Sequence, residues 1–468
     1  MSLVLDPFPA WNDLRSGSED TIITDLFVTR DARLASAIPQ TGASLPAIHK
    51  LPTELVASIF VLCHAIESDY RRDSATNCAR VILSHVCRRW RAVILSMPLL
   101  WSTISVHDAS SASLPKLTAH LERSMPCPLS ISVMPNPYMA EGQFKHVEDI
   151  MALVAQHAER WKSLRLYLSA APMCVILDLL QATSFPSIET LEVGAETWNR
   201  QVSQAVFNVL SASACIRSVT WRGPGGFRGV PSGSCWEILT NININLNSVS
   251  LGDVHTLLSQ CYSVVALRVS CISGDMTPNN GETITLHRLE TLSICTYEPL
   301  HDLFDQLCLP KLKMLTLRYY YHISSHDRAC KALDSLLARS DCTLRTLILH
   351  DDRMPSDALD QLLRMPTLDN LRDLSIELPT LTDLTLQTLT RPVDDGECVL
   401  PQLESLSLGY STSKDGRLGD MATSRSEGGG GQFAAGQLKR LHTSVDDSRW
   451  RDRRALDALK ARGLDIDY

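Results

Sequence analysis

A short pattern, apolar-x-x-apolar-x-apolar, recurs along the chain after residue 160. The last three positions alternate with a period of two, as in a strand that buries one face. Each copy therefore predicts a short, half-buried strand. The eleven copies are Trp161/Leu164/Leu166, Ile188/Leu191/Val193, Ile216/Val219/Trp221, Leu246/Val249/Leu251, Val264/Leu267/Val269, Leu289/Leu292/Ile294, Leu312/Leu315/Leu317, Leu344/Leu347/Leu349, Leu371/Leu374/Ile376, Leu403/Leu406/Leu408 and a degenerate Leu438/Leu441/Thr443.

The segments between these copies have helical spacing, for example 332–337 and 358–363. Copies start roughly 18 to 35 residues apart, which is near the period of leucine-rich repeats. One strand and one helix cannot bury their apolar faces alone, but stacked copies can, with the strands on the concave side. We therefore predict a solenoid over 161–444, and an ordinary α/β domain with leucine-rich strands is the alternative.

The solenoid is expected to be irregular, because the repeat length varies and the Asn that commonly follows the strand motif is absent. Without that Asn, the turns must satisfy their backbone groups in another way. Segments 222–234 and 412–432 are rich in Gly and Ser, so we expect loops there. The end of the chain, 445–468, predicts a helix that caps the last repeat through Trp450, Leu456 and Leu459.

A different pattern precedes the repeats. Pro52 and Glu54 suit the first turn of a helix, which needs no amide donor there and favours a carboxylate. A second helical pattern extends from Cys78 to Leu95, with Ile82, Val86, Trp90 and Val93 on one face, and ends before Pro98. We interpret 1–48 as a flexible leader and 105–160 as a connecting helical segment.

The helical segment contains four short motifs in order: Leu51-Pro52-Thr53-Glu54-Leu55, Ile59-Phe60, Val86-Cys87-Arg88-Arg89-Trp90 and Leu99-Leu100-Trp101. Together, in this order, they resemble an F-box. A small all-α F-box at 49–104 followed by irregular leucine-rich repeats, an α/β fold overall, is similar to an architecture common in mushroom-forming (basidiomycete) fungi. The polar stretch between Phe60 and Val81 departs from the family pattern and indicates a lengthened loop.

The resemblance implies a role in protein ubiquitination. F-box proteins bind the Skp adaptor of an SCF-type cullin–RING ligase and present a target protein, here unknown, through the remaining domain. Carried over by position, the adaptor-facing or supporting residues are Leu51, Pro52, Leu55, Ile59, Val86 and Trp90. Packing inside the helical unit is the alternative role for each, with even weight for Trp90 and Trp101. The alternative function is a non-degradative leucine-rich-repeat scaffold whose N-terminal helices only cap the solenoid.

Composition and charge narrow the class of partner. The formal net charge is −8, which argues against nucleic acid as the main partner. The N-terminus lacks a basic start and a long apolar run, and no stretch of about 18 apolar residues occurs, so we expect an intracellular protein without a membrane partner. The 14 cysteines are dispersed, without a C-x-x-C pair, and predict reduced thiols.

Motifs for chemistry are missing from the sequence. It contains neither a phosphate-binding G-x-x-x-x-G-K-[ST] loop nor a G-x-S-x-G elbow. His322 and His326 have the spacing of a zinc pair but no catalytic Glu between them, and Cys87 beside two arginines fits an F-box helix. We therefore expect no enzyme activity, metal or cofactor. On the concave side the charged candidates for substrate binding are Arg165, Glu192 and Arg268.

Overall fold

The protein is described here by a computed structural model. The structure describes residues 47–70, 79–107, 113–134, 144–181, 186–195, 198, 200–227, 234–274, 283–320, 326–351, 353–377, 381–392, 398–410, 413–426 and 436–468. The chain divides into two units, 1–59 and 60–468. The predicted leader lies outside the described residues, apart from the start of a short 3-10 helix, η1 (Ala47–Lys50).

The N-terminal helices differ from the prediction: α2 (Thr53–Tyr70) continues into the stretch after Phe60 that was predicted to be a loop, and the second helix is divided. The predicted second helix, Cys78–Leu95, is two helices with a turn at Val86 between them. The Cys87 sulfur accepts a hydrogen bond from the Trp90 amide at 3.4 Å and so caps the second of these. The helices are α2 (Thr53–Tyr70), α3 (Ala79–Ser84), α4 (Arg88–Leu95) and α5 (Pro98–Trp101).

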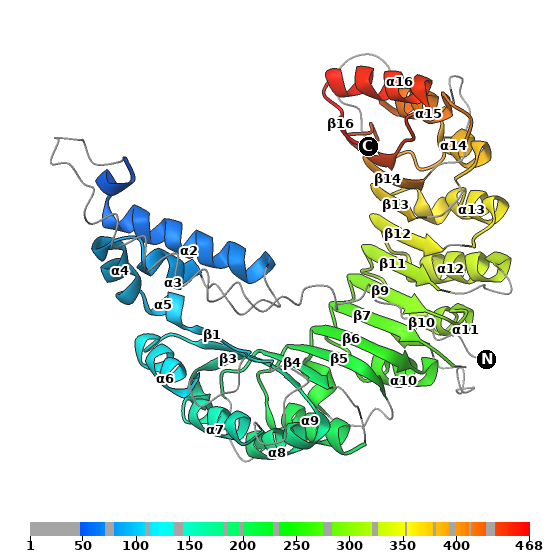
Figure 1. The fold of residues 1–468 in the computed structure, drawn as a ribbon. Coiled ribbons are helices and arrows are strands. Elements are labelled where there is room, and N and C mark those ends of the chain that lie inside the picture. Colours follow the sequence, from blue (N-terminus) through cyan, green and yellow to red (C-terminus); the bar gives the residue numbers. More distant parts are fainter. Residues whose placement is uncertain are drawn as a thin grey trace, which may run out of the picture. The chain divides into compact units, whose positions relative to one another are not determined.

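A parallel sheet of 14 strands forms the larger unit, in the order β1 to β7, β9 and β11 to β16 (Figure 1). This sheet with its accompanying helices is a solenoid-like α/β fold, as the repeated pattern predicted. Its strands are β1 (Thr103–Val106), β2 (Leu129–Val133), β3 (Trp161–Leu168), β4 (Thr190–Ala195), β5 (Ser218–Phe227), β6 (Asn241–Val249), β7 (Ala266–Ile272), β9 (Thr291–Thr296), β11 (Met314–Tyr319), β12 (Thr346–Asp351), β13 (Asp373–Glu377), β14 (Ser405–Tyr410), β15 (Arg440–Ser444) and β16 (Asp465–Asp467).

Helices connect successive strands and lie on one face of the sheet (Figure 1). The other face is called the helix-free face below. A separate two-stranded sheet pairs β8 (Ile284–Thr285) with β10 (Leu307–Cys308). The connecting helices are α6 (Ser113–Arg123), α7 (Phe144–Ala155), η3 (Ala158–Arg160), α8 (Ala170–Gln181), α9 (Arg200–Ala212), η4 (Ser234–Ile238), α10 (Leu251–Leu258), α11 (His301–Phe304), α12 (His326–Ser340), α13 (Ser356–Leu363), η5 (Pro366–Leu368), α14 (Asp383–Leu389), α15 (Arg417–Ser426) and α16 (Trp450–Ala461).

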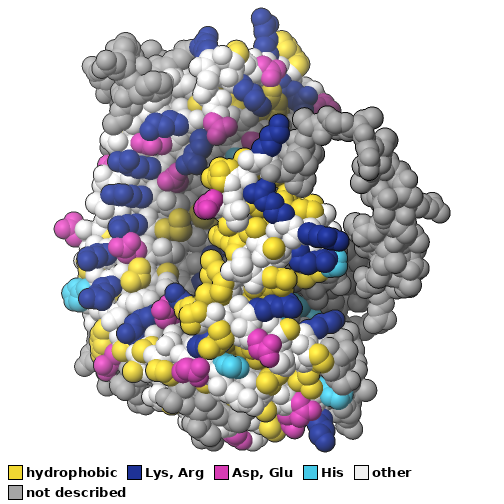
Figure 2. Space-filling view, turned by 90° about the vertical axis from the view of Figure 1, so that its left-hand side faces the viewer, with side chains coloured by type: hydrophobic (Ala, Val, Ile, Leu, Met, Phe, Trp, Pro, Cys, Tyr) yellow, Lys and Arg dark blue, Asp and Glu magenta, His cyan; other side chains and the backbone are white. Residues whose placement is uncertain are grey.

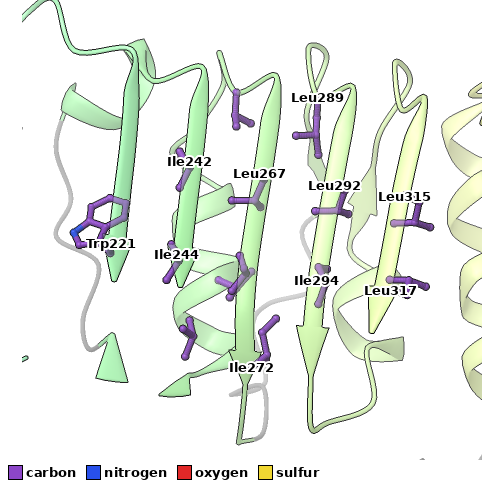
Figure 3. Packing of buried hydrophobic residues seen from close by; sticks show 14 of the residues in the cluster. Trp221, Ile242, Ile244, Leu267, Ile272, Leu289, Leu292, Ile294, Leu315 and Leu317 are labelled. Atoms are coloured by element: carbon purple, nitrogen blue, oxygen red, sulfur yellow. The ribbon is translucent and has the colours of Figure 1, made fainter. Parts of the chain in front are cut away.

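The core is one continuous layer between the sheet and the helices. Its apolar residues occupy equivalent positions of neighbouring strands, as Figure 3 shows for β5 to β11. Leu292 is paired in register with Leu315, and Leu315 with Leu347. Because the side-chain period of a strand is two, this register buries every second residue and leaves the residues between them on the helix-free face.

One predicted strand was placed wrongly. In β6 the residues aligned with Leu267 and Val269 of β7 are Ile242 and Ile244, rather than Val249 and Leu251. Ser250, which lies between Val249 and Leu251 of the predicted copy, is not in a strand but caps helix α10, where its hydroxyl accepts the Asp253 amide at 3.0 Å.

The predicted boundaries of the repeats also change. The sheet begins with β1, and the segment 105–160 holds β2 as well as helices, so it is not purely a helical connection. At the C-terminal end, α16 is followed by a further strand, β16. Leu456 and Leu459 are buried there as predicted, but Trp450 is 58% exposed.

Two segments that we expected to be loops contain regular structure. Residues 222–227 extend β5, and α15 lies within 412–432. Gly223 adopts φ +137°, and a Cβ there would lie 2.1 Å from the Ala195 carbonyl oxygen, so this close approach needs glycine. The Trp198 indole donates to the Arg222 carbonyl at 2.8 Å, which fixes this part of β5.

Candidate interaction surfaces

Exposed apolar side chains are concentrated at the N-terminal helices. Among the described residues, sixteen large apolar side chains are exposed, and nine of them fall between residues 48 and 99. On α2, Leu55 is 52%, Ile59 is 37% and Leu62 is 62% exposed, whereas Val56 is buried. The spacing of four and three residues places the exposed three along one stripe of the helix. Such a concentration of exposed apolar groups is typical of a protein-binding surface.

The six residues predicted to face or support an adaptor differ in exposure. Pro52, Leu55, Ile59 and Val86 are exposed, and Leu51 is half-buried. Trp90 is only partly exposed, and its ring contacts Phe60 edge-on with centroids 5.1 Å apart. Trp90 thus packs against Phe60, whereas Pro52, Leu55, Ile59 and Val86 are open to solvent.

Val86 belongs to a second group of exposed apolar residues, which lies in the larger unit. Its members lie on α3, in the turn between α3 and α4, at the end of α4 and on α5. Of these, only Val86 was predicted to face an adaptor, although Leu99 also belongs to the motifs that resemble an F-box and Ile82 to the second helical pattern. Its members are Val81, Ile82, Val86, Leu95 and Leu99.

Trp101 joins the helices to the first repeat. The side chain is 4% exposed, and its indole donates to the Ile94 carbonyl at 2.9 Å. The guanidinium of Arg123 lies 4.6 Å from the indole centroid, and the His120 ring packs edge-on at 5.1 Å. Burial, together with the charges of Arg80 and Arg123, lowers the pKa of His120 to about 4.

Arg80 covers the end of the sheet. Strand β1 is an edge strand, so its backbone groups on one side lack a neighbouring strand. The Arg80 guanidinium donates to the carbonyl of Thr103 in β1 at 3.1 Å and to that of Leu100 at 3.2 Å. The helices α3 to α5 thus cap the first repeat.

The helix-free face brings two of the three predicted substrate-binding residues together. Arg165 and Glu192 are paired in register, and the Arg165 Nε lies 2.7 Å from a Glu192 carboxylate oxygen. Arg222 binds the other carboxylate oxygen at 2.6 Å. Sequence reasoning missed Arg222 because it stands in a segment that we expected to be a loop. The three side chains form one ion-pair cluster with one positive charge in excess.

Arg268 stands apart from that cluster, on β7. It lines a hollow together with Ser218, Asn243, Thr291 and Ser293. Asn243 was missed because the β6 pattern was placed wrongly. The hollow is polar and carries a single positive charge, so it offers hydrogen-bonding groups rather than a strong electrostatic site.

The structure describes only one histidine of the candidate metal pair. His322 lies outside the described residues, and the buried His326 Nε2 lies 3.2 Å from Asp351 Oδ2. In the part of the chain that the structure describes, no three His, Cys, Asp or Glu side chains gather as metal ligands. The cysteines described carry free thiols. No described helix has the length and apolar character needed to cross a bilayer.

Comparison with known proteins assigns no family to the chain. No family model matches it, and no curated protein does. Among solved structures, a crystal structure of a Bacteroides fragilis protein is similar at 14% sequence identity and a TM-score of 0.36, over 62% of this chain and 82% of that one. This low similarity adds nothing to the fold described above, and the F-box resemblance stays a prediction.

Proposed function

We propose that this protein is the substrate-recognition subunit of an SCF-type ubiquitin ligase, which binds a Skp adaptor through the segment 49–104. The observation that carries the proposal is the exposure of the motif residues Leu55, Ile59 and Val86, since most other large apolar side chains that the structure describes are buried. Apolar residues that served only in folding would be buried, as Val56 and Phe60 are.

The exposed stripe of α2 has the chemistry of a helix that lies in a partner's apolar groove. Leu55, Ile59 and Leu62 supply apolar anchors on successive turns. Each fully buried aliphatic side chain contributes about 1.5–3 kcal/mol relative to its exposed state. Substitution of one or two of these three anchors should therefore weaken binding strongly.

The repeats supply the target-binding part of the proposal. Their polar helix-free face extends over 14 adjacent strands, which is suited to a protein target. In this proposal the chain performs no chemistry itself. It holds the target near the ubiquitin that other subunits transfer, a proximity effect.

The test is co-purification of the full chain with a Skp adaptor. We expect Leu55→Glu/Ile59→Glu to reduce adaptor binding by at least tenfold, because two charges would enter an apolar interface. The control is Val175→Glu on α8, which adds one charge at a position as exposed as Leu55 but within the repeats. Unchanged thermal unfolding of all variants excludes a folding effect. Absence of adaptor binding by the folded wild-type chain would overturn the proposal.

A second candidate function is a non-degradative repeat scaffold. The observation in its favour is the cap-like packing of Trp101 and Arg80 against the first repeat. The same co-purification separates the two functions, because a cap that acts only in folding binds no adaptor.

A further inference from the structure

A row of charged residues lies along the side of the sheet formed by the N-terminal ends of the strands. The residues immediately before β9 and β11 to β15 are linked by backbone hydrogen bonds of 2.7–2.9 Å, each amide donating to the carbonyl of the preceding member. Because neighbouring strands are about 4.8 Å apart, their side chains form a regular column. The members in order are Glu290, Lys313, Arg345, Arg372, Glu404 and Lys439.

Figure 2 shows Lys and Arg side chains in a column with carboxylates beside them. Asp373 and Arg440, which begin β13 and β15, adjoin the row and line the same hollow as five of its members. We call Lys313, Arg345, Arg372, Lys439 and Arg440 the basic edge. Its five cations lie beside Glu290, Asp373 and Glu404, and Asp465 is paired in register with Arg440, which leaves one positive charge in excess.

The ion pairs leave the centre of the basic edge unneutralised. Lys313 binds Glu290 at 2.8 Å. Glu404 lies 2.8 Å from Lys439 and 3.6 Å from Arg372, and Asp373 binds Arg440 at 3.1 Å. These contacts occupy the three carboxylates. Arg345 is exposed and forms no ion pair with any described residue.

The arrangement is unfavourable for the isolated chain. Lys313, Arg345 and Arg372 are three successive cations that precede adjacent strands, and like charges at this spacing destabilise a sheet. An anionic group placed at Arg345 would relieve that repulsion. A guanidinium can also donate two parallel hydrogen bonds to a carboxylate or a phosphate.

We propose that the basic edge binds an acidic segment of a partner protein, with a carboxylate or phosphate held by Arg345 between Lys313 and Arg372. The biological role of this binding rests on the proposed function, in which the partner protein is the target of the ligase. The three interspersed carboxylates favour a peptide with spaced anionic groups over nucleic acid, whose phosphates repeat at every nucleotide and would meet Glu290, Asp373 and Glu404.

Fluorescence anisotropy with labelled peptides tests the proposal on the full chain. The probes are a twelve-residue peptide rich in Glu and Ser, its phosphoserine form, its Gln-for-Glu form and a single-stranded oligonucleotide. We expect the acidic forms to bind with an affinity that falls with salt, and the Gln form to bind weakly. Tighter binding of the phosphorylated form would identify phosphate as the preferred group, and equal binding would identify carboxylate.

Arg345→Gln/Arg372→Gln should weaken binding of the acidic peptides by roughly tenfold or more. The matched control is Arg217→Gln/Arg417→Gln, which removes the same charge. Arg217 is exposed and precedes β5 at the equivalent position, and Arg417 is exposed at the start of α15. An equal loss in the control overturns the proposal, as does absence of saturable binding by both acidic peptides or preference for the oligonucleotide.

Adaptor co-purification distinguishes the two proposals. The basic-edge variant should bind the adaptor like the wild type, because its changes lie far along the strand order from β1. Acidic-peptide binding without adaptor binding would support the basic edge and refute the ligase role. The reverse result would refute the basic edge alone.

Discussion

Individual arginine side chains bind backbone carbonyl groups at turns of the repeats. Arg160 donates to the carbonyl of Cys127 at 2.8 Å, and Arg339 to that of Leu307 at 2.8 Å. Arg425 is almost fully buried and donates to the Leu400 carbonyl at 3.1 Å, and burial lowers its pKa to about 10. The repeats lack the usual turn Asn, and these side chains satisfy turn carbonyls instead.

The lowered pKa of His120 predicts a pH dependence of stability. The pKa is about 4 in the folded chain and about 6.5 unfolded, so the unfolded state binds more protons between these values. The free energy of unfolding should therefore fall as the pH drops from about 6.5 to 4, by up to about 3 kcal/mol from this group. Denaturant unfolding at several pH values measures the slope.

His120→Gln should flatten that slope even if it lowers stability overall, because glutamine does not titrate in this range. His287→Gln, at an exposed position outside the contacts of Trp101, is the control. Parallel pH profiles for the wild type and the His120 variant would contradict the assignment.

At the scale of the element, each strand has one face in the core and one face without helices. In β11, Leu317 is 2% exposed, while Thr316 lies between two buried residues and points the opposite way. We predict that Leu317→Asp destabilises the repeats by more than about 4 kcal/mol, because a buried charge lacks a partner. Thr316→Asp should cost less than about 1 kcal/mol. Equal losses in denaturant unfolding would refute the orientation of β11.

The sequence predicted most strands because alternation and strand geometry share one period. It failed at β6, where Ile242, Ile244, Leu246 and Val249 extend the apolar pattern beyond one copy and leave its register open. It also missed β1, although Trp101/Ile104/Val106 fits the repeat pattern, because Trp101 was assigned to the helical motif. The basic edge could not be predicted, since its members become neighbours only through the register of separate strands.

At the scale of the whole molecule, the larger unit is a one-dimensional array. The parallel sheet pairs each strand only with the next in order, from β1 to β16. Helices α3 to α5 cover the β1 end, and α16 packs on α15 near the β16 end. At Gly419 of α15 a Cβ would lie 2.6 Å from that of Ala455 in α16, so this contact needs glycine. Stability should therefore be local, set by each repeat and its neighbours.

A core substitution near one end should then unfold only that end. Leu441 is buried in β15, between β14 and β16. We predict that Leu441→Asp removes hydrogen-exchange protection from β14 to β16 and α15 to α16, while β1 to β5 keep theirs, because few contacts join distant repeats. Adaptor binding should also persist if the N-terminal helices carry it. Simultaneous loss of protection in β1 to β5 would instead show that the 14 strands unfold as one cooperative unit.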